Sequence, residues 1–122
     1  MKAKQAQHLR QGLEAEQCAY AHLQRQGLRL ITRNYRTPFG EIDLIMEQSN
    51  TIVFVEVRYR RSKTFGTPAE TVGARKQEKL RASAGHYLQR NRKISKKPCR
   101  FDIVAVTGAP DSNQVEWLQD AF

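Results

Sequence analysis

Residues 40–60, GEIDLIMEQSNTIVFVEVRYR, decide how this chain folds. Two runs rich in Ile, Val, Leu and Phe stand on either side of the polar pair Ser49-Asn50. Such runs, joined by a short turn, are typical of a β-hairpin. We therefore predict strands over residues 41–48 and 51–60, with the turn at Ser49 and Asn50.

The register of this hairpin sets two carboxylates against each other. With a two-residue turn, Asp43 lies directly opposite Glu56. Ile45 and Phe54 form the next pair on the same face, so the acids lie in apolar strands. Residues opposed in this way have Cβ atoms ~5 Å apart, and two carboxylates at that separation repel each other. A slip of one residue would send them to opposite faces.

A hard divalent cation with oxygen ligands, Mg²⁺ or Mn²⁺, resolves this repulsion. The alternatives are a shared proton and a bridge from a nearby arginine or lysine. The same register sets Arg58 opposite Glu41, which predicts a cross-strand salt bridge. Arg58 can instead approach a phosphate with two parallel hydrogen bonds.

A helix is expected before the hairpin, over residues 4–26, and Gly27 ends it. Its apolar side chains share one face at helical spacing: Leu9, Leu13, Tyr20 and Leu23. Glu16 falls in the middle of this apolar face, where a charged side chain is unusual. Three explanations are open: a role in a functional site, a helix end that leaves the core, and a hydrogen bond to a buried donor. A strand over residues 28–35 follows.

A second helix is expected after the hairpin, from Thr67 to about Asn91. Thr67 and Glu70 form a capping box, and Pro68 suits the first turn. Lys76 lies within the inner, apolar stripe of this helix. A lysine there either extends along the apolar surface with its ammonium group in water or serves a site.

Two further strands are predicted over residues 99–107 and 114–118, which gives the element order αβββαβ with a short final strand. The helical crossover makes the strands before and after the second helix parallel, with a right-handed connection. We therefore predict an α/β fold in which a mixed sheet is flanked by helices.

The amino-acid composition is typical of a globular protein and is strongly basic. The chain has 122 residues, 39% of them hydrophobic, and we expect one domain over residues 1–122. Its formal charge is +9, from 21 basic and 12 acidic residues. This surplus favours an anionic partner, although solubility alone also explains it. Cys18 and Cys99 match no metal spacing, and no apolar run is long enough to span a membrane. We therefore expect a cytoplasmic protein with two free thiols.

The basic residues form two clusters that are candidates for binding nucleic acid. The first follows the carboxylate hairpin: Arg58, Arg60, Arg61 and Lys63. The second lies in an acid-free stretch over residues 79–101: Arg90, Arg92, Lys93, Lys96 and Lys97. Phosphate backbones are bound by such surfaces. The alternative is a solvated helix face and loop.

Five segments resemble a known family: NYR (34–36), GEIDLI (40–45), VFVEVRYR (53–60), FGTP (65–68) and FDIVAVTG (101–108). Together they resemble the YraN-like uncharacterised protein family of bacteria, over nearly the whole chain. That family is similar to the PD-(D/E)xK nucleases, in particular the archaeal Holliday-junction resolvases. The resemblance implies a restriction-endonuclease-like αβββαβ core.

The resemblance also implies roles for individual residues. Glu16 matches the acid of the first helix, Asp43 the acid of the second strand, and Glu56 the acid of the E-x-K element. Asp43, Glu56 and the backbone carbonyl of Val57 would hold one or two Mg²⁺ or Mn²⁺ ions. Glu16 would bind a metal directly or through water.

Arg58 stands where the lysine of E-x-K is expected. Arginine stabilises negative charge but cannot deprotonate water, because its pKa exceeds ~12. Lys76, on the second helix, is the candidate substitute. Five residues are thus candidates for catalysis: Glu16, Asp43, Glu56, Arg58 and Lys76.

These observations predict a metal-dependent nuclease or resolvase-like protein that hydrolyses phosphodiesters, with DNA as the favoured partner. Resolvase-like enzymes act as dimers, and a homodimer is left open here. Two alternatives also remain open. One is a catalytically inactive nucleic-acid-binding module, and the other is a basic protein-interaction module.

Overall fold

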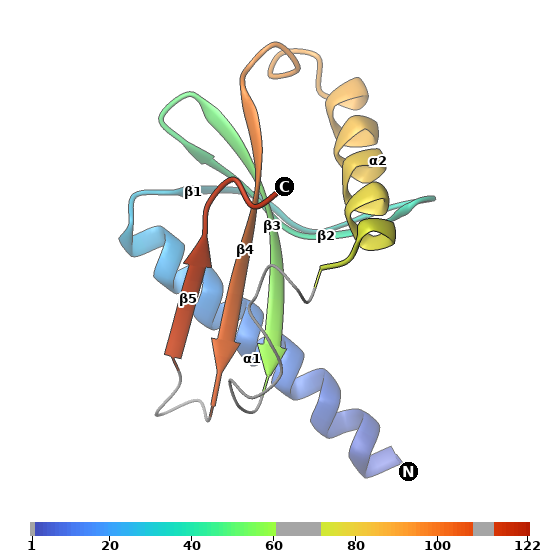
Figure 1. The fold of residues 1–122 in the computed structure, drawn as a ribbon, viewed down its shortest axis with the longest axis vertical. Coiled ribbons are helices and arrows are strands. Elements are labelled where there is room, and N and C mark those ends of the chain that lie inside the picture. Colours follow the sequence, from blue (N-terminus) through green and yellow to red (C-terminus); the bar gives the residue numbers. More distant parts are fainter. Residues whose placement is uncertain (1, 61–71, 109–113) are drawn as a thin grey trace.

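The computed structural model describes residues 2–60, 72–108 and 114–122, with side chains from residue 10 onward (Figure 1). The elements in chain order are α1 (Lys2–Arg25), β1 (Arg29–Thr37), β2 (Gly40–Gln48), β3 (Thr51–Arg60), α2 (Ala74–Arg90), β4 (Cys99–Thr107) and β5 (Gln114–Leu118). This is the predicted order, and both strands of the central hairpin lie where they were expected.

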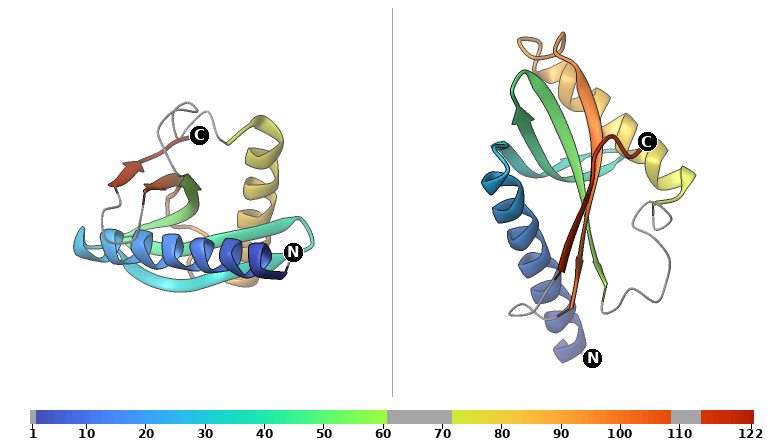
Figure 2. Two further views of the ribbon diagram at one scale, coloured as in Figure 1. Left: turned by 90° about the horizontal axis from the view of Figure 1, so that it is seen from below. Right: turned by 60° about the vertical axis from the view of Figure 1, so that its left-hand side comes forward.

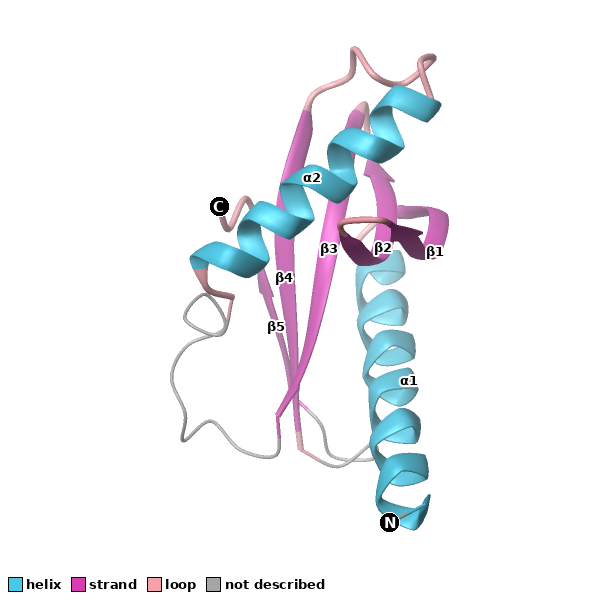
Figure 3. Cartoon of the chain, turned by 90° about the vertical axis from the view of Figure 1, so that its right-hand side faces the viewer, coloured by secondary structure: helices cyan, strands magenta, loops and turns pink. Residues whose placement is uncertain are grey.

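The strands form one five-stranded sheet in the order β1-β2-β3-β4-β5. β3 and β4 are parallel and the other neighbours are antiparallel. α1 and α2 pack on opposite faces of the strands, which gives three layers (Figure 2, right-hand view; Figure 3). The predicted α/β fold with a mixed sheet is confirmed, and it is compatible with a restriction-endonuclease-like core.

α1 covers its face of the sheet mainly with small side chains. Ala15, Ala19 and Leu23 recur every four residues and are buried against the strands. The alanines allow the helix backbone to lie close to the sheet. The helix ends in a Schellman motif, because Gly27 has φ +94° and the Leu28 N–H donates to the carbonyl of Leu23 at 3.0 Å.

The predicted inner position of Leu13 is wrong, since its side chain is 63% exposed. The face of α1 that packs on the sheet is the one formed by Ala15, Ala19 and Leu23, and Leu13 points away from it at helical spacing. Figures 1 and 3 show the N-terminal part of α1 continuing past the ends of the strands. Tyr20 and Leu23 do pack in the core, and the Leu9 side chain lies outside the described residues. Glu16 is half-buried and follows directly after the buried Ala15.

β2 follows β3 for only part of its length. The two strands keep the predicted register as far as the pair Leu44–Val55, where the ladder ends. Ile42 and Ile45 both join the core beneath α2, whereas Leu44 joins the core beneath α1. Residues three apart in a regular strand face opposite sides, so β2 twists at Asp43. Beyond that point β2 continues with β1 as a separate two-stranded arm.

This divergence corrects two predicted pairs. Asp43 and Glu56 are not ladder partners, and neither are Glu41 and Arg58. Glu41 instead faces Arg36 on β1, with 3.9 Å between the charged groups. The physical reason is that α2 packs on the β1–β2 arm and buries Ile42, which turns this end of β2 away from β3.

α2 begins later than predicted, at Ala74 instead of Thr67. Gly73 is its N-cap and supplies no side-chain cap, and the Gln77 N–H makes the first helical hydrogen bond to the Gly73 carbonyl at 3.0 Å. Val72 is buried in the core just before the helix, so tertiary packing sets this boundary. The capping box over residues 67–70 lies outside the described residues. The C-terminal end at Asn91 is as predicted.

Cys18 and Cys99 both keep their thiols outside any disulfide, as predicted. Burial raises the pKa of the Cys99 thiol, which makes its reactive thiolate scarcer. No helix among the described residues is long and apolar enough to cross a membrane.

Candidate functional site

Side chains from three elements meet where β2 leaves β3: Glu16 of α1, Asp43 of β2 and Glu56 of β3. We call these three residues the carboxylate site. The Val57 N–H donates to Oδ2 of Asp43 at 2.8 Å, so a side chain takes the place of a ladder hydrogen bond. Glu16 lies close enough to Asp43 for the Asp43 charge to raise its pKa. The Asp43 charge raises the pKa of Glu56. The structure thus brings together the three acids that the sequence singled out.

The backbone of Val57 is also turned toward Asp43. In a β-strand, the N–H and C=O groups of one residue point to the same edge. Because the Val57 N–H reaches Asp43, the Val57 carbonyl faces the same side of β3. Two of the predicted oxygen donors, the Asp43 carboxylate and the Val57 carbonyl, therefore lie at the same edge of β3.

The carboxylate site holds its protons tightly. Burial, and next the charge of Asp43, raise the pKa of Glu16 to about 7. Burial, and next the charge of Asp43, also raise the pKa of Glu56 to about 7. Burial raises the pKa of Asp43 itself, although the Val57 N–H opposes this rise. All three pKa shifts favour the protonated form of these carboxyl groups in the metal-free protein.

Asn34 belongs to the site, and sequence reasoning missed it. With its amide oriented by the surrounding acceptors, its nitrogen lies 3.1 Å from Oε1 of Glu16 and 3.0 Å from Oε1 of Glu41. Its backbone is left-handed, with φ +51°, a conformation that asparagine adopts more readily than most residues. The sequence carries no sign of this bridge, because it joins α1 to the diverging end of β2.

Two cations flank Glu56 on its other side. Lys76 Nζ lies 3.6 Å and Arg58 Nη1 lies 3.7 Å from the same oxygen, Oε1 of Glu56. The second oxygen, Oε2, is buried and has no hydrogen-bond partner among the described residues. Lys76 thus reaches the acid of the E-x-K element from α2, at the same range as Arg58.

The donors of the site suit a hard divalent cation. Asp43, Glu56 and the Val57 carbonyl supply oxygen ligands, which Mg²⁺ and Mn²⁺ prefer. The buried, unpartnered Oε2 of Glu56 is an atom that a cation would satisfy. Over residues 2–60, 72–108 and 114–122, no three His, Cys, Asp or Glu side chains form a ready-made ligand set. Binding of a cation would therefore require these carboxyl groups, whose pKa values are raised, to lose their protons and to turn toward the ion.

The predicted basic residues lie in several different environments. Arg60 donates to the Thr107 hydroxyl at 3.1 Å and pairs with Glu116 at 3.4 Å, and its side chain is 13% exposed. Lys97 pairs with Glu47 at 2.6 Å. Arg90, Arg92, Lys93 and Lys96 lie at the C-terminal end of α2 and in the loop that follows. Arg61 and Lys63 lie outside the described residues.

We expect these environments to separate structural from phosphate-binding arginines. Arg92→Ala should reduce the magnitude of the log–log salt slope of nucleic-acid binding by about 0.7 to 0.9, the loss of one phosphate contact. Arg60→Ala should leave that slope unchanged and lower the free energy of unfolding by about 1 kcal/mol, because it removes a partly buried hydrogen bond. Fluorescence anisotropy across a salt series and urea melts measure the two effects. Equal slopes for Arg92→Ala and wild type would remove Arg92 from the interface.

Comparison with known proteins places the chain in a family. The sequence profile of the uncharacterised protein family UPF0102 matches residues 15–106, which include the whole carboxylate site. A UPF0102 protein of Nitrosococcus oceani is 49% identical over 119 residues, which cover 98% of this chain and 96% of that protein. A UPF0102 protein of Nitrosomonas europaea is 50% identical over 111 residues, 91% of this chain and 92% of that protein. The chain therefore belongs to the uncharacterised protein family UPF0102, the YraN-like family that its motifs predicted.

Proposed function

We propose that this protein is a metal-dependent phosphodiesterase that acts on nucleic acid, with DNA as the favoured substrate. One observation carries the proposal: the buried acid Glu56 and the half-buried acid Asp43 approach each other, and Glu56 keeps an unpartnered oxygen, Oε2, beside the cations of Lys76 and Arg58. Such a cluster is costly for stability. It is explained when the acids serve to bind a cation.

The ligands of a Mg²⁺ or Mn²⁺ ion would be Asp43, Glu56 and the Val57 carbonyl, and Glu16 would bind directly or through water. A divalent cation, when bound, lowers the pKa of a coordinated water and neutralises charge on a phosphate. Asn34 holds the Glu16 carboxylate toward Asp43 from the far side. The Val57 N–H fixes the orientation of Asp43.

Lys76 and Arg58 would stabilise the negative charge that develops on the phosphate during hydrolysis. Both lie at the edge of the site, with side chains 41% and 36% exposed, so a substrate phosphate can approach them from solvent. Lys76 is the lysine of this pair, and its ammonium group lies at the same range from Glu56 as Arg58, which makes it the counterpart of the usual E-x-K lysine.

Hydrolysis of linear and branched DNA, and of RNA, tests this function directly. We expect strand breaks that require Mg²⁺ or Mn²⁺ and stop in EDTA. Isothermal calorimetry in buffers of different ionisation enthalpy should show proton release when Mg²⁺ binds. Salt-sensitive binding without any cleavage would contradict the enzyme and favour the non-catalytic module. Binding that is indifferent to salt would favour a protein partner.

A further inference from the structure

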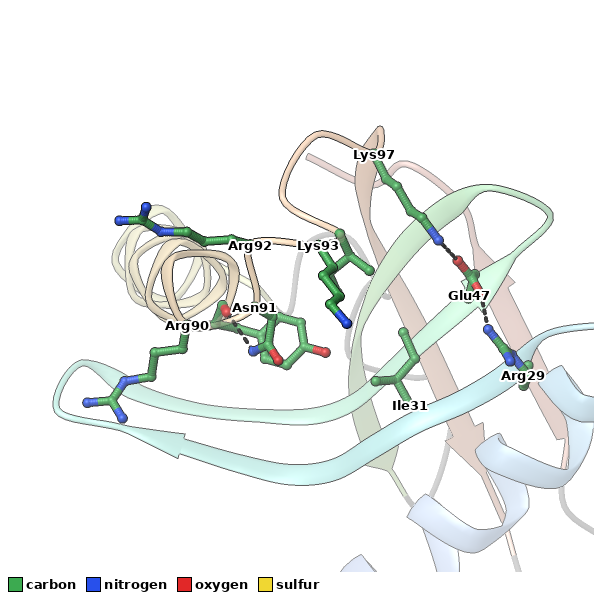
Figure 4. A pocket seen from close by; sticks show the side chains of 10 residues that line it. Arg29, Ile31, Glu47, Arg90, Asn91, Arg92, Lys93 and Lys97 are labelled. Atoms are coloured by element: carbon green, nitrogen blue, oxygen red, sulfur yellow. Dashed lines mark hydrogen bonds and ion pairs between the residues drawn. The ribbon is translucent and has the colours of Figure 1, made fainter.

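A concave site lies away from the carboxylate site, at the end of β1 and β2 where β2 still pairs with β3. It is a cavity of about 470 Å³ beside the C-terminal end of α2, within the range of roughly 300 to 1,000 Å³ that small-ligand pockets span. Figure 4 shows its lining residues coming from β1, β2, α2 and the loop before β4. None of the roles proposed for the carboxylate site uses it.

Part of this cavity is apolar. Ile31, Tyr87 and Ile94 line it, and all three also contact the core beneath α2. The Tyr87 side chain is itself buried. Such a lining suits a flat, weakly polar group, because planar rings gain from contact with aliphatic and aromatic side chains.

The rest of the cavity is strongly cationic. Five basic side chains line it against one carboxylate, that of Glu47. Glu47 accepts hydrogen bonds from both Arg29 and Lys97, and these two cations lower the pKa of its carboxyl group. Its charge is thus already compensated. The negative end of the α2 dipole opposes anion binding only weakly at an exposed helix terminus, so the surplus of cations makes the cavity attractive to anions.

Lys93 is the cation best placed to receive an anion. Figure 4 shows its side chain extending between the end of α2 and Ile31, whereas Arg90 and Arg92 extend outward from the rim. No described carboxylate lies within ion-pair distance of Lys93. On the wall beside it, Asn91 donates its amide nitrogen to the Tyr87 carbonyl at 2.8 Å, which leaves the Asn91 side-chain oxygen as an acceptor.

We propose that this pocket binds one unpaired nucleotide unit, with its base on Ile31 and Ile94 and its phosphate on Lys93. The inference deepens the proposed function and rests on its nucleic-acid-binding part, not on hydrolysis. The pocket and Lys76 lie at opposite ends of α2, which are about 20 Å apart at 1.5 Å per residue. That span equals about six steps of a DNA strand. One strand can therefore reach both sites.

Two ligands supply such a nucleotide unit, a free mononucleotide and an unpaired position in a DNA strand, and the experiment distinguishes them. Binding is measured in EDTA with thymidine 5′-monophosphate, thymidine, inorganic phosphate, a paired duplex and the same duplex with one unpaired thymidine. Burying one base should make the unpaired duplex bind about tenfold tighter than the paired one. Thymidine monophosphate that binds in the pocket as tightly as this duplex would assign the site to the free nucleotide.

Two lysines of one loop provide a matched pair of variants. Lys93→Glu should remove most of the tenfold preference for the unpaired duplex. Lys96→Glu makes the same charge change outside the pocket lining, so it should weaken both duplexes equally and keep the preference. NMR shifts of the Ile31 and Ile94 methyl groups should follow nucleotide binding in wild type and not in Lys93→Glu.

The proposal is overturned by equal affinity for both duplexes together with inorganic phosphate competing as well as thymidine monophosphate. It is also overturned if the preference survives in Lys93→Glu, or if the isoleucine methyl groups do not shift. Failure of hydrolysis with the preference intact would remove only the catalytic proposal, because every measurement here is made without metal. Hydrolysis without any preference for the unpaired duplex would remove only the proposal for the pocket.

Discussion

Glu56→Gln should lower the divalent-dependent hydrolysis of DNA by at least about 100-fold. Replacing a residue that only orients a metal ligand costs 10- to 100-fold, and Glu56 is proposed as a ligand itself. Glutamine keeps the shape of the side chain but loses the charge that attracts the cation. Asp43→Asn should have the same effect, since both acids approach the same place. Initial rates at saturating and limiting Mg²⁺ measure the loss.

Glu116→Gln is the control for this loss. Glu116 pairs with Arg60 at the β4–β5 side of the sheet, so the same chemical change there should leave the rate at the wild-type level. In EDTA, Glu56→Gln should bind DNA at least as tightly as wild type, because it removes a negative charge from the site. Hydrolysis by Glu56→Gln at the wild-type rate would rule out Glu56 as a metal ligand.

The metal-free protein should lose stability as the pH rises from 4.5 to about 7. Glu56 has an ordinary pKa of 4.5 and a folded-state pKa of about 7, so the folded chain binds this proton more tightly than the unfolded chain. The resulting stability is present below pH 4.5 and is lost as the pH rises through the folded pKa. For Glu56, a pKa rise of this size corresponds to about 3 kcal/mol in the free energy of unfolding. Glu16 acts in the same direction, with a smaller effect because it is more exposed.

Urea melts in EDTA at several pH values measure this slope, and two variants identify its source. Glu56→Gln cannot ionise at this position, so its stability should vary less with pH over the same window. Glu116→Gln should keep the wild-type slope. A wild-type protein whose stability is flat or rises over this window would show that the buried carboxylates are not held protonated.

Added Mg²⁺ should reverse the loss at pH 8 and have little effect at pH 5. A cation competes with protons for the same carboxylates. At 100 times its dissociation constant it stabilises the folded state by about 2.7 kcal/mol. The same melts with Mg²⁺ would therefore report binding independently of hydrolysis. An equal effect at both pH values would place the ion away from the carboxylate site.

Local patterns in the sequence were enough to predict the strands and most of their pairing. The hairpin register is correct from the turn to Leu44–Val55, because side-chain alternation and a two-residue turn together allow one pairing. The strand–helix–strand order was enough to predict the parallel β3–β4 pair. Lys76 and Glu16 were found because a charged residue on an apolar helix face is unusual, and both do approach the acids of the hairpin.

Other features depend on contacts between residues far apart in the chain, and sequence patterns carry little sign of them. β2 leaves β3 at Asp43 because α2 buries Ile42 on its own side of the sheet. Asn34 enters the site because β1 accompanies the diverging end of β2. α2 begins at Ala74 because Val72 is anchored in the core. Leu13 is exposed because the face of α1 that packs on the sheet is the one formed by Ala15, Ala19 and Leu23.

The sequence by itself determined which residues carry charge, which strands form and which acids are out of place among apolar neighbours. Those properties follow from side-chain periodicity, which acts over a few residues. Only the tertiary structure decided how the acids meet, through a hydrogen bond from the Val57 N–H to Asp43 instead of a cross-strand pair. It also decided that Arg60 and Lys97 have carboxylate partners. The reason is that a partner is chosen by the packing of whole elements, and that packing brings together residues that no local pattern relates.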